Sequence, residues 1–209
     1  MPAPPQRRIG LTGGIATGKS RVGHLLAEHF HLPVLDADRY AREALAPETA
    51  ATRAVLNRWG GAVATPVGTV EAIDRAALGR IVFAEPEERR WLERLVHPLV
   101  RQRFALELEN LATEPAVVLM IPLLFEAGLE SLCTEVWLVD CSDIEQRRRL
   151  MVRDGLRADE AEARLAAQWP QADRRQRADR ILPNPDGMDD TGLCEAIRQG
   201  LADHQVDPP

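Results

Sequence analysis

The residues with the clearest capacity for chemistry form one glycine-rich stretch near the start of the chain. It consists of residues 13–20, which read Gly13-Gly14-Ile15-Ala16-Thr17-Gly18-Lys19-Ser20. The spacing matches the Gly-x-x-x-x-Gly-Lys-Ser pattern of loops that bind nucleotide phosphates. Glycines let backbone N–H groups converge on a phosphate, and the N-terminus of a following helix adds partial positive charge. We therefore predict an ATP phosphate site here rather than an ordinary glycine turn, with Lys19 on the β- and γ-phosphates and the Ser20 hydroxyl on Mg²⁺.

The basic residues of the chain single out Lys19. Of the 26 basic residues, 25 are arginine and one is lysine, and that one is Lys19. Arginine supplies positive charge elsewhere, whereas a compact ammonium on a slim stem suits the phosphate loop. Because the chain has no second lysine, it cannot contain the Asn-Lys-x-Asp motif that reads guanine. This disfavours a GTPase switch, which is the alternative class of P-loop protein.

Two carboxylates, Asp36 and Asp38, follow a short apolar stretch two residues apart. The carboxyl ends of strands form the functional edge of parallel sheets. An acceptor hydroxyl needs a carboxylate that orients it and takes its proton, and Mg²⁺ needs an acid nearby, often through water. The pair therefore predicts phosphoryl transfer to a hydroxyl. The alternative is two solvated acids that cap the next helix.

Three further groups leave two interpretations open. Asp140 ends the apolar stretch 136–139 and either holds Mg²⁺ or is a helix-start acid with no ligand role. Arg149 and Arg153 stand four residues apart on a predicted helix, so they share one face. They either close over the transferring phosphoryl group or belong to a solvated basic face. His97 precedes Pro98, and without a functional role it is a hydrogen-bonded residue of a helix kink.

The elements that must position these groups alternate between strands and helices. A strand, a glycine turn, a helix and a strand make one βαβ unit, which implies a parallel sheet. The pattern predicts strands at 9–12, 33–36, 116–121, 135–140 and 180–182. It predicts helices at 19–30, 40–45, 47–59, 74–83, 86–111, 142–153, 159–169 and 191–204. The expected fold is an α/β P-loop NTPase with a five-stranded parallel sheet and helices on both faces.

The predicted helices from 40 to 112 fall between two strands of the sheet, so we interpret them as an insertion that covers a substrate. Within it, residues 61–72 carry Gly, Pro and Thr and are expected to form a loop. Pro98 predicts a break or kink in the long helix. The nucleotide-binding core is then 1–39, 113–141 and 178–204, and 142–177 forms a helical lid.

The bulk composition narrows the class of protein. A chain of 209 residues suits one domain with an elaboration. Its net charge of −6 disfavours binding to nucleic acid. No apolar run is long enough to span a membrane, and we see no export signal, so we expect a cytoplasmic protein. Three scattered cysteines indicate free thiols.

The ordered series of motifs resembles the dephospho-coenzyme A kinase family of P-loop kinases. The resemblance runs from Ile9 to about Gly187. The matching segments are 10–15, 35–38, 73–75, 82–83, His97-Pro98, the specific segment 121–126 (Ile-Pro-Leu-Leu-Phe-Glu), 146–154, Ala167-Gln168, Ala178-Asp179 and Asn184. This family transfers the γ-phosphoryl group of ATP to the ribose 3′-hydroxyl of dephospho-CoA, which gives coenzyme A.

The resemblance implies roles for particular residues. Asp38 would be the catalytic base, acting with Lys19 and Arg149, and Ser20 and Asp36 would hold Mg²⁺. The ATP contacts would be residues 13–20, Arg149, Arg153 and, near the adenine, Asn184. The acceptor contacts would be Asp38, Arg75, His97, Pro122 and Leu123. The partners would be ATP and dephospho-CoA, on a monomer or a small homo-oligomer.

The chain departs from the family pattern at three places. Ala16-Thr17 stands where the family usually has Gly-Ser, and alanine fits the loop if its φ stays negative. Pro183 and Pro185 flank Asn184 where the family usually has other residues, and Asn184 is the residue expected near the adenine. The stretch 169–177 matches poorly. The alternative function is that of another small-molecule kinase, acting on a nucleoside or nucleotide.

Overall fold

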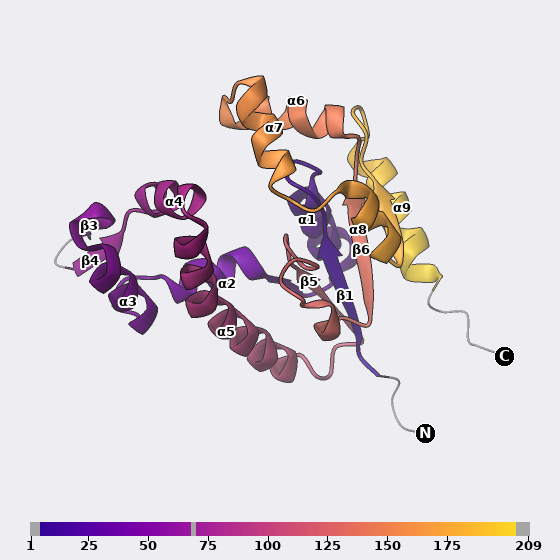
Figure 1. Cartoon of the computed structure of the whole chain (residues 1–209). Coiled ribbons are helices and arrows are strands. Elements are labelled where there is room, and N and C mark those ends of the chain that lie inside the picture. The colour runs from indigo at the N-terminus through magenta and orange to yellow at the C-terminus, as the bar shows by residue number, and fades with distance from the viewer. Residues whose placement is uncertain (1–4, 68–69, 204–209) are drawn as a thin grey trace. The chain divides into compact units, whose positions relative to one another are not determined.

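The computed structural model describes residues 5–67 and 70–203. The chain divides into two compact units, which are described separately (Figure 1). The first consists of Met1–Asp36 and Leu111–Pro209, and the second is Ala37–Asn110. The functions expected of a substrate cap at 40–112 and of a lid at 142–177 stay predictions. No helix among the described residues is both long and apolar enough to cross a membrane.

The first unit is built on a five-stranded sheet in the order β2-β5-β1-β6-β7. Each neighbouring pair of strands is parallel, which confirms the predicted sheet. The strands are β1 (Arg7–Thr12), β2 (Val34–Asp36), β5 (Ala116–Met120), β6 (Glu135–Asp140) and β7 (Arg180–Pro183). Because all five run the same way, their carboxyl ends meet at one edge, where β1 leads into the glycine-rich loop.

The helices of the first unit follow the predicted pattern except in the stretch before β7. They are α1 (Lys19–Phe30), α6 (Asp143–Asp154), α7 (Ala158–Ala166), α8 (Gln171–Arg177) and α9 (Asp190–Ala202), with a 3₁₀ turn η2 (Glu130–Leu132). The predicted helix 159–169 ends three residues early, and α8 was not predicted, because its seven residues show no apolar period. The predicted end of the last helix, His204, lies outside the described residues.

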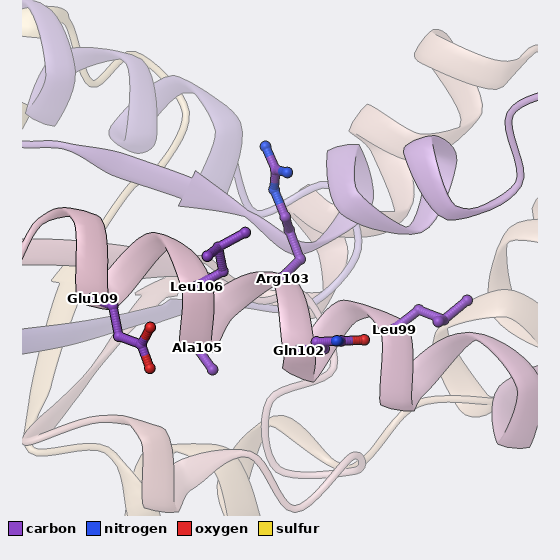
Figure 2. A pocket seen from close by; sticks show the side chains of 6 residues that line it. All are labelled: Leu99, Gln102, Arg103, Ala105, Leu106 and Glu109. Atoms are coloured by element: carbon purple, nitrogen blue, oxygen red, sulfur yellow. The ribbon is translucent and has the colours of Figure 1, made fainter.

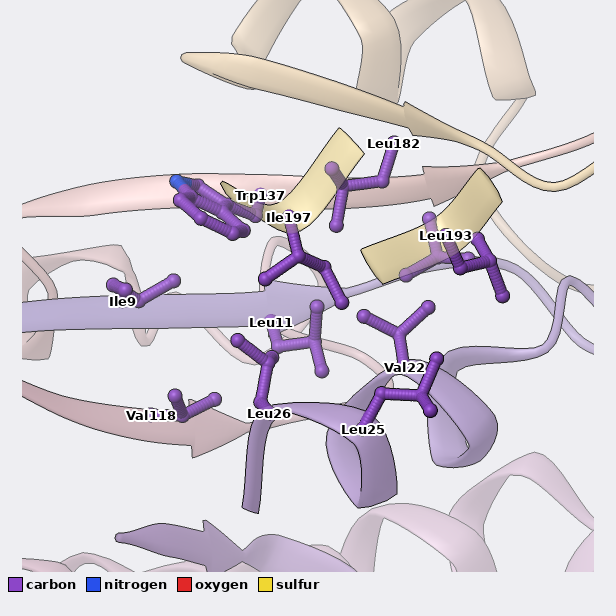
Figure 3. Packing of buried hydrophobic residues seen from close by; sticks show 11 residues of the cluster. Ile9, Leu11, Val22, Leu25, Leu26, Val118, Trp137, Leu182, Leu193 and Ile197 are labelled. Atoms are coloured by element: carbon purple, nitrogen blue, oxygen red, sulfur yellow. The ribbon is translucent and has the colours of Figure 1, made fainter. Parts of the chain in front are cut away.

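The core of this unit lies between one face of the sheet and the helices α1 and α9 (Figure 3). Its members alternate along the strands and recur every three or four residues along the helices, as burial of one face requires. They are Ile9, Leu11, Val22, Leu25, Leu26, Val118, Trp137, Val139, Leu182, Leu193 and Ile197. This packing fixes α1 beneath the loop that precedes it.

The other face of the sheet is covered at β1 by the segment that follows β5. A Cβ placed on Gly10 would lie 2.5 Å from Cys133 Sγ and 2.9 Å from Leu124 Cδ1. Glycine is therefore needed at this position of β1, because any larger residue would push the segment away. Leu124 and Phe125, from the specific segment 121–126, are buried here.

The second unit is helical with one small hairpin. Its elements are α2 (Ala37–Ala44), α3 (Ala50–Trp59), η1 (Gly60–Ala62), β3 (Ala64–Val67), β4 (Val70–Ile73), α4 (Arg75–Ala84) and α5 (Pro86–Asn110). Strands β3 and β4 pair antiparallel, so the prediction of a loop at 61–72 was wrong at 64–67 and 70–72. Residues 68–69 lie outside the described residues. Ile73 of β4 and Val63, which directly precedes β3, join a second core with Val55 and Leu78. This core stabilises a hairpin that the composition alone disfavours.

Three helices in this unit also differ from prediction. Helix α2 begins at Ala37, three residues before the predicted start at Tyr40. Helix α5 runs without a break through Pro98, so the prediction of a break there was wrong, and a kink stays a prediction. Its second half carries the residues that line a pocket, Leu99, Gln102, Arg103, Ala105, Leu106 and Glu109 (Figure 2). Burial of Val96 and Val100 on either side of the proline anchors both halves of the helix to the core. Pro47 lies outside α3, because Thr49 is the N-cap and accepts a hydrogen bond from Thr52 N at 3.0 Å.

Candidate active site

The glycine-rich loop connects the end of β1 to the start of α1 and is closed by bonds of its own. Both the backbone N and the Oγ1 of Thr17 donate to the carbonyl of Gly14, at 3.3 and 2.9 Å. A Cβ on Gly13 would lie 2.7 Å from the carbonyl oxygen of Val139 on β6. The loop is therefore compact and packed against the neighbouring strand. Lys19 is half-buried and Ser20 is exposed on the first turn of α1.

Ala16 is in a left-handed backbone conformation, with φ of 62°. We expected its φ to stay negative, and that expectation was wrong. A Cβ in this region costs roughly 1–2 kcal/mol, so the surroundings of the loop must hold Ala16 there. The Gly-x-x-x-x-Gly-Lys-Ser spacing does not reveal this, because it leaves the residue at position 16 unspecified.

Asn184, at the end of β7, lies against the second glycine of the pattern. Its side chain is 3% exposed, and Nδ2 donates to the carbonyl of Thr17 at 2.8 Å. A Cβ on Gly18 would lie 2.1 Å from that nitrogen, and Gly18 itself has φ of 94°. Asn184 is therefore part of the wall of the phosphate loop. Its predicted position near the adenine stays a prediction.

Arg149 and Arg153 share helix α6 but contact different partners. Arg149 Nη2 donates to the carbonyl of Asn184 at 2.8 Å, and its Nε donates to Asp186 at 3.0 Å. Arg153 Nε pairs with Asp154 at 2.7 Å, and this hydrogen bond lowers the pKa of Asp154. The structure thus places Arg149 beside the residue that lines the phosphate loop, and it pairs Arg153 within its own helix.

A cluster of polar side chains from the predicted lid surrounds the front of the loop, and sequence reasoning missed it. Gln168 Oε1 accepts the N–H of Ile15 at 2.9 Å. A Cβ on Gly14 would lie 2.7 Å from Gln146 Oε1 and 3.0 Å from Arg174 Nη1. Arg174 lies in the stretch 169–177, which matches the family pattern poorly, whereas Gln168 lies in the matching segment Ala167-Gln168.

Arg174 is the most buried charged residue of this cluster. It is 2% exposed and pairs with Glu126, the last residue of segment 121–126, at 2.6 Å. Asp140 lies close by in the same network. It accepts from Gln171 and, at 2.7 Å, from Arg175 Nε, so its carboxylate binds helix α8.

The carboxyl edge of the sheet also carries Asp36, Pro122 and Leu123. Asp36 is the last residue of β2 and is in register with Met120 of β5. The carbonyl of Pro122 accepts from Thr12 Oγ1 at 3.2 Å. Leu123 is 43% exposed, unlike the buried Leu124 beside it, so it offers apolar surface at this edge.

The remaining predicted residues lie in the second unit. Asp38 is exposed on the first turn of α2. Arg75 is the first residue of α4 and donates to the carbonyl of Arg42 at 3.3 Å. His97 is exposed on α5. Their roles toward a substrate stay predictions.

Comparison with known proteins agrees with this fold and loop. The family model for dephospho-CoA kinase matches residues 7–190. The dephospho-CoA kinase of Parasynechococcus marenigrum (strain WH8102) is 60% identical over 196 residues, which cover 94% of this chain and 96% of the relative. That of Synechococcus sp. (strain CC9605) is 62% identical over 179 residues, covering 86% and 85%.

Solved structures show the same likeness. The structure of TT1252 from Thermus thermophilus superposes with a TM-score of 0.81 at 36% identity, covering 98% of this chain and 100% of that one. Dephospho-CoA kinase from Campylobacter jejuni gives 0.66 at 26% identity, covering 95% and 98%. A shikimate kinase from Bacteroides thetaiotaomicron shares the fold, with a TM-score of 0.53 at 16% identity. The chain is a P-loop kinase and belongs to the dephospho-CoA kinase family.

Proposed function

We propose that this chain carries out the reaction of its family on the residues gathered at the carboxyl edge of the sheet. The observation that carries this is the closed phosphate loop, with Gly18 against Asn184 and Lys19 at the start of α1. The oxygen of the ribose 3′-hydroxyl of dephospho-CoA attacks the γ-phosphorus of ATP. The bond from that phosphorus to the β–γ bridging oxygen breaks, and ADP leaves.

The donor side of this site, which binds ATP, is formed by residues 13–20, including Lys19. The N–H groups of the loop and the N-terminus of α1 bind the phosphates, and the Lys19 ammonium offsets charge on the β- and γ-phosphates. Arg149 is supported as an ATP contact by its bond to the carbonyl of Asn184. For Arg153, and for adenine contact by Asn184, the support is the sequence resemblance.

The chain offers oxygen donors that suit Mg²⁺. Ser20 presents its hydroxyl on the first turn of α1, and Asp36 ends β2. Hydroxyl and carboxylate oxygens, together with phosphate oxygens of the substrate, are the ligands that Mg²⁺ prefers. We therefore assign the metal to these two residues, where it would offset charge on the phosphates. Ser20 and Asp36 would hold it there.

The acceptor side uses Asp38 as the base that takes the proton of the 3′-hydroxyl. Asp38 lies two residues after Asp36, so the proposed base closely follows the end of β2. Arg75, His97, Pro122 and Leu123 bind the rest of dephospho-CoA. A carboxylate in this position both orients the hydroxyl and accepts its proton in the transition state.

The setting of the enzyme is also a proposal. We propose a cytoplasmic protein, supported by three free thiols at Cys133, Cys141 and Cys194, which suit a reducing compartment. We propose that it acts on small molecules as a monomer or a small homo-oligomer.

Replacing Asp38 with asparagine tests the proposed base. Asp38→Asn keeps the shape of the side chain but removes the proton acceptor, so kcat should fall by about 10²-fold or more. The dissociation constant of ATP should stay within about threefold, because no phosphate contact is lost. Glu43→Gln is the matched control, an exposed acid on the same helix whose 3.6 Å pair with Arg39 contributes little. Turnover of Asp38→Asn within about threefold of the parent would exclude Asp38 as the base.

A further inference from the structure

The side chain of Gln168 lies where it can control the shape of the phosphate loop. Its Oε1 accepts the Ile15 N–H at 2.9 Å, across 153 residues of sequence. Ile15 directly precedes Ala16, the loop residue with φ of 62°. A bond to the residue before a strained one restricts the backbone that carries the strain.

The bond from Gln168 adds to the internal bonds of the loop, which span the strained residue. Thr17 donates to the carbonyl of Gly14, so Ile15 and Ala16 are the two central residues of the turn that this closes. Without the attachment at Ile15, only the bonds of Thr17 would hold Ala16 in the left-handed region, where a Cβ is disfavoured. The N–H groups of the loop would then point in other directions and bind phosphate less well.

Gln168 is itself held in place from both ends. On one side, its backbone N donates to the carbonyl of Leu165 at the end of α7, at 3.1 Å. On the other, the ring of Trp169 stacks on Phe125 at 6.2 Å with 10° between the planes. Phe125 is 4% exposed in the core of the unit. The glutamine is therefore presented to the loop by a rigid support.

We propose that Gln168 is a positioning residue, which holds Ile15 and Ala16 in the conformation that binds the phosphates of ATP. It acts through the backbone of the loop and not through the substrate. This rests on the proposal that residues 13–20 bind ATP. It adds to that proposal a residue outside the Gly-x-x-x-x-Gly-Lys-Ser pattern on which the affinity for ATP depends.

Two substitutions separate the hydrogen bond from packing. Gln168→Met keeps the length of the side chain but has no amide oxygen, and Gln168→Ala removes the whole side chain. Both should raise the dissociation constant of ATP by about fivefold, as loss of one such bond predicts. The KM for dephospho-CoA should stay within about twofold in both, because the acceptor side is untouched. Gln176→Ala is the control, since Gln176 is exposed on the nearby helix α8 and should leave ATP binding unchanged.

A glycine at position 16 tests the link to backbone strain. Glycine adopts positive φ without the penalty that alanine carries, so in the Ala16→Gly background Gln168→Met should weaken ATP binding by less than about twofold. Calorimetric titration with ATP and amide exchange at Ile15 are the readouts, and exchange should be faster in Gln168→Met.

Three results would overturn the role of Gln168. They are an unchanged ATP affinity in Gln168→Met, a loss only in Gln168→Ala, and an equal loss in the Ala16→Gly background. A parent chain that bound no ATP would overturn the proposed donor site as well. The two failures are therefore distinguishable in the same titration.

Discussion

The side-chain amide of Asn184 donates a hydrogen bond to the carbonyl oxygen of Thr17 at 2.8 Å, which fastens the end of β7 to the phosphate loop. The amide nitrogen occupies the space where a Cβ on Gly18 would lie. Gly18 is therefore required for two reasons, its φ of 94° and the close approach of Asn184. The loop and the last strand of the sheet form one structural unit at this point.

Gly18→Ala should destabilise the chain and abolish tight ATP binding. The left-handed backbone alone costs roughly 1–2 kcal/mol for alanine, and the new Cβ would also displace Asn184. We expect the thermal midpoint to fall by about 4 °C or more. Gly61→Ala is the control, because a Cβ at Gly61 meets nothing within 4 Å, and it should change stability by less than about 0.5 kcal/mol. Equal midpoints for the two variants would contradict this account of Gly18.

Arg174→Met should destabilise the first unit through the carboxylate that it leaves behind. Removing one partner of a buried ion pair costs about 3–5 kcal/mol. Because Glu126 is 19% exposed, we expect the free energy of unfolding to fall by about 2–3 kcal/mol. The double change Arg174→Met with Glu126→Gln should recover part of this loss, because no unpaired charge remains.

Chemical denaturation measures both variants. The control is Arg198→Met, which breaks an exposed pair with Glu195 and should cost less than about 1 kcal/mol. A double variant less stable than Arg174→Met would show that an unpaired charge on Glu126 is not the cause.

Two of the three thiols should resist alkylation in the folded chain. Burial raises the pKa of Cys133 to about 12 and that of Cys141 to about 11, from an ordinary value of 9.0. Only the thiolate reacts quickly, so at pH 8 iodoacetamide should modify both far more slowly than it does after denaturation. Mass spectrometry of the modified peptides gives the two rates, and rapid native labelling of Cys133 would contradict its burial.

The same two thiols predict how stability changes in alkaline solution. The folded chain holds these protons more tightly than the unfolded chain does. Their contribution to the free energy of unfolding is therefore complete below pH 9 and is lost as the pH rises toward 11–12. Replacing Cys133 with alanine should reduce this alkaline loss, measured by denaturation at pH 8 and pH 10.5.

Ser20→Ala tests the assignment of the metal. It removes the hydroxyl that is proposed to bind Mg²⁺ and leaves the backbone of the loop unchanged, so the Mg²⁺ concentration for half-maximal turnover should rise several-fold. Ser20→Thr keeps the hydroxyl and should stay near the parent. An unchanged Mg²⁺ requirement in Ser20→Ala would contradict the assignment.

The sequence predicted the parts of the molecule that depend on local pattern. The glycine loop, the strands and the parallel sheet could be predicted because each depends on residue types only a few positions apart in the sequence. Helix α8 was missed because Gln171–Arg177 has a single apolar residue, Ala172, and so no apolar period, although the helix buries Arg174. The charge of Arg174 can be buried because the side chain pairs with Glu126, 48 residues earlier.

The departures within the site have the same origin. Spacing predicts that Arg149 and Arg153 share a face, but Arg149 pairs with Asp186, 37 residues later, whereas Arg153 pairs with its neighbour Asp154. Ala16, with its positive φ, lies in a turn that Thr17 closes and that Gln168 contacts at Ile15, across 153 residues. Contacts over such separations leave no period in the sequence.

The most direct test of the account is turnover of the purified chain with ATP, Mg²⁺ and a choice of acceptors. We predict that dephospho-CoA is converted to coenzyme A with release of ADP, and that adenosine and the common nucleoside monophosphates are phosphorylated far more slowly. The product should carry its new phosphate on the ribose 3′-oxygen. Clear use of a nucleoside or nucleotide acceptor, with no coenzyme A formed, would contradict the central claim.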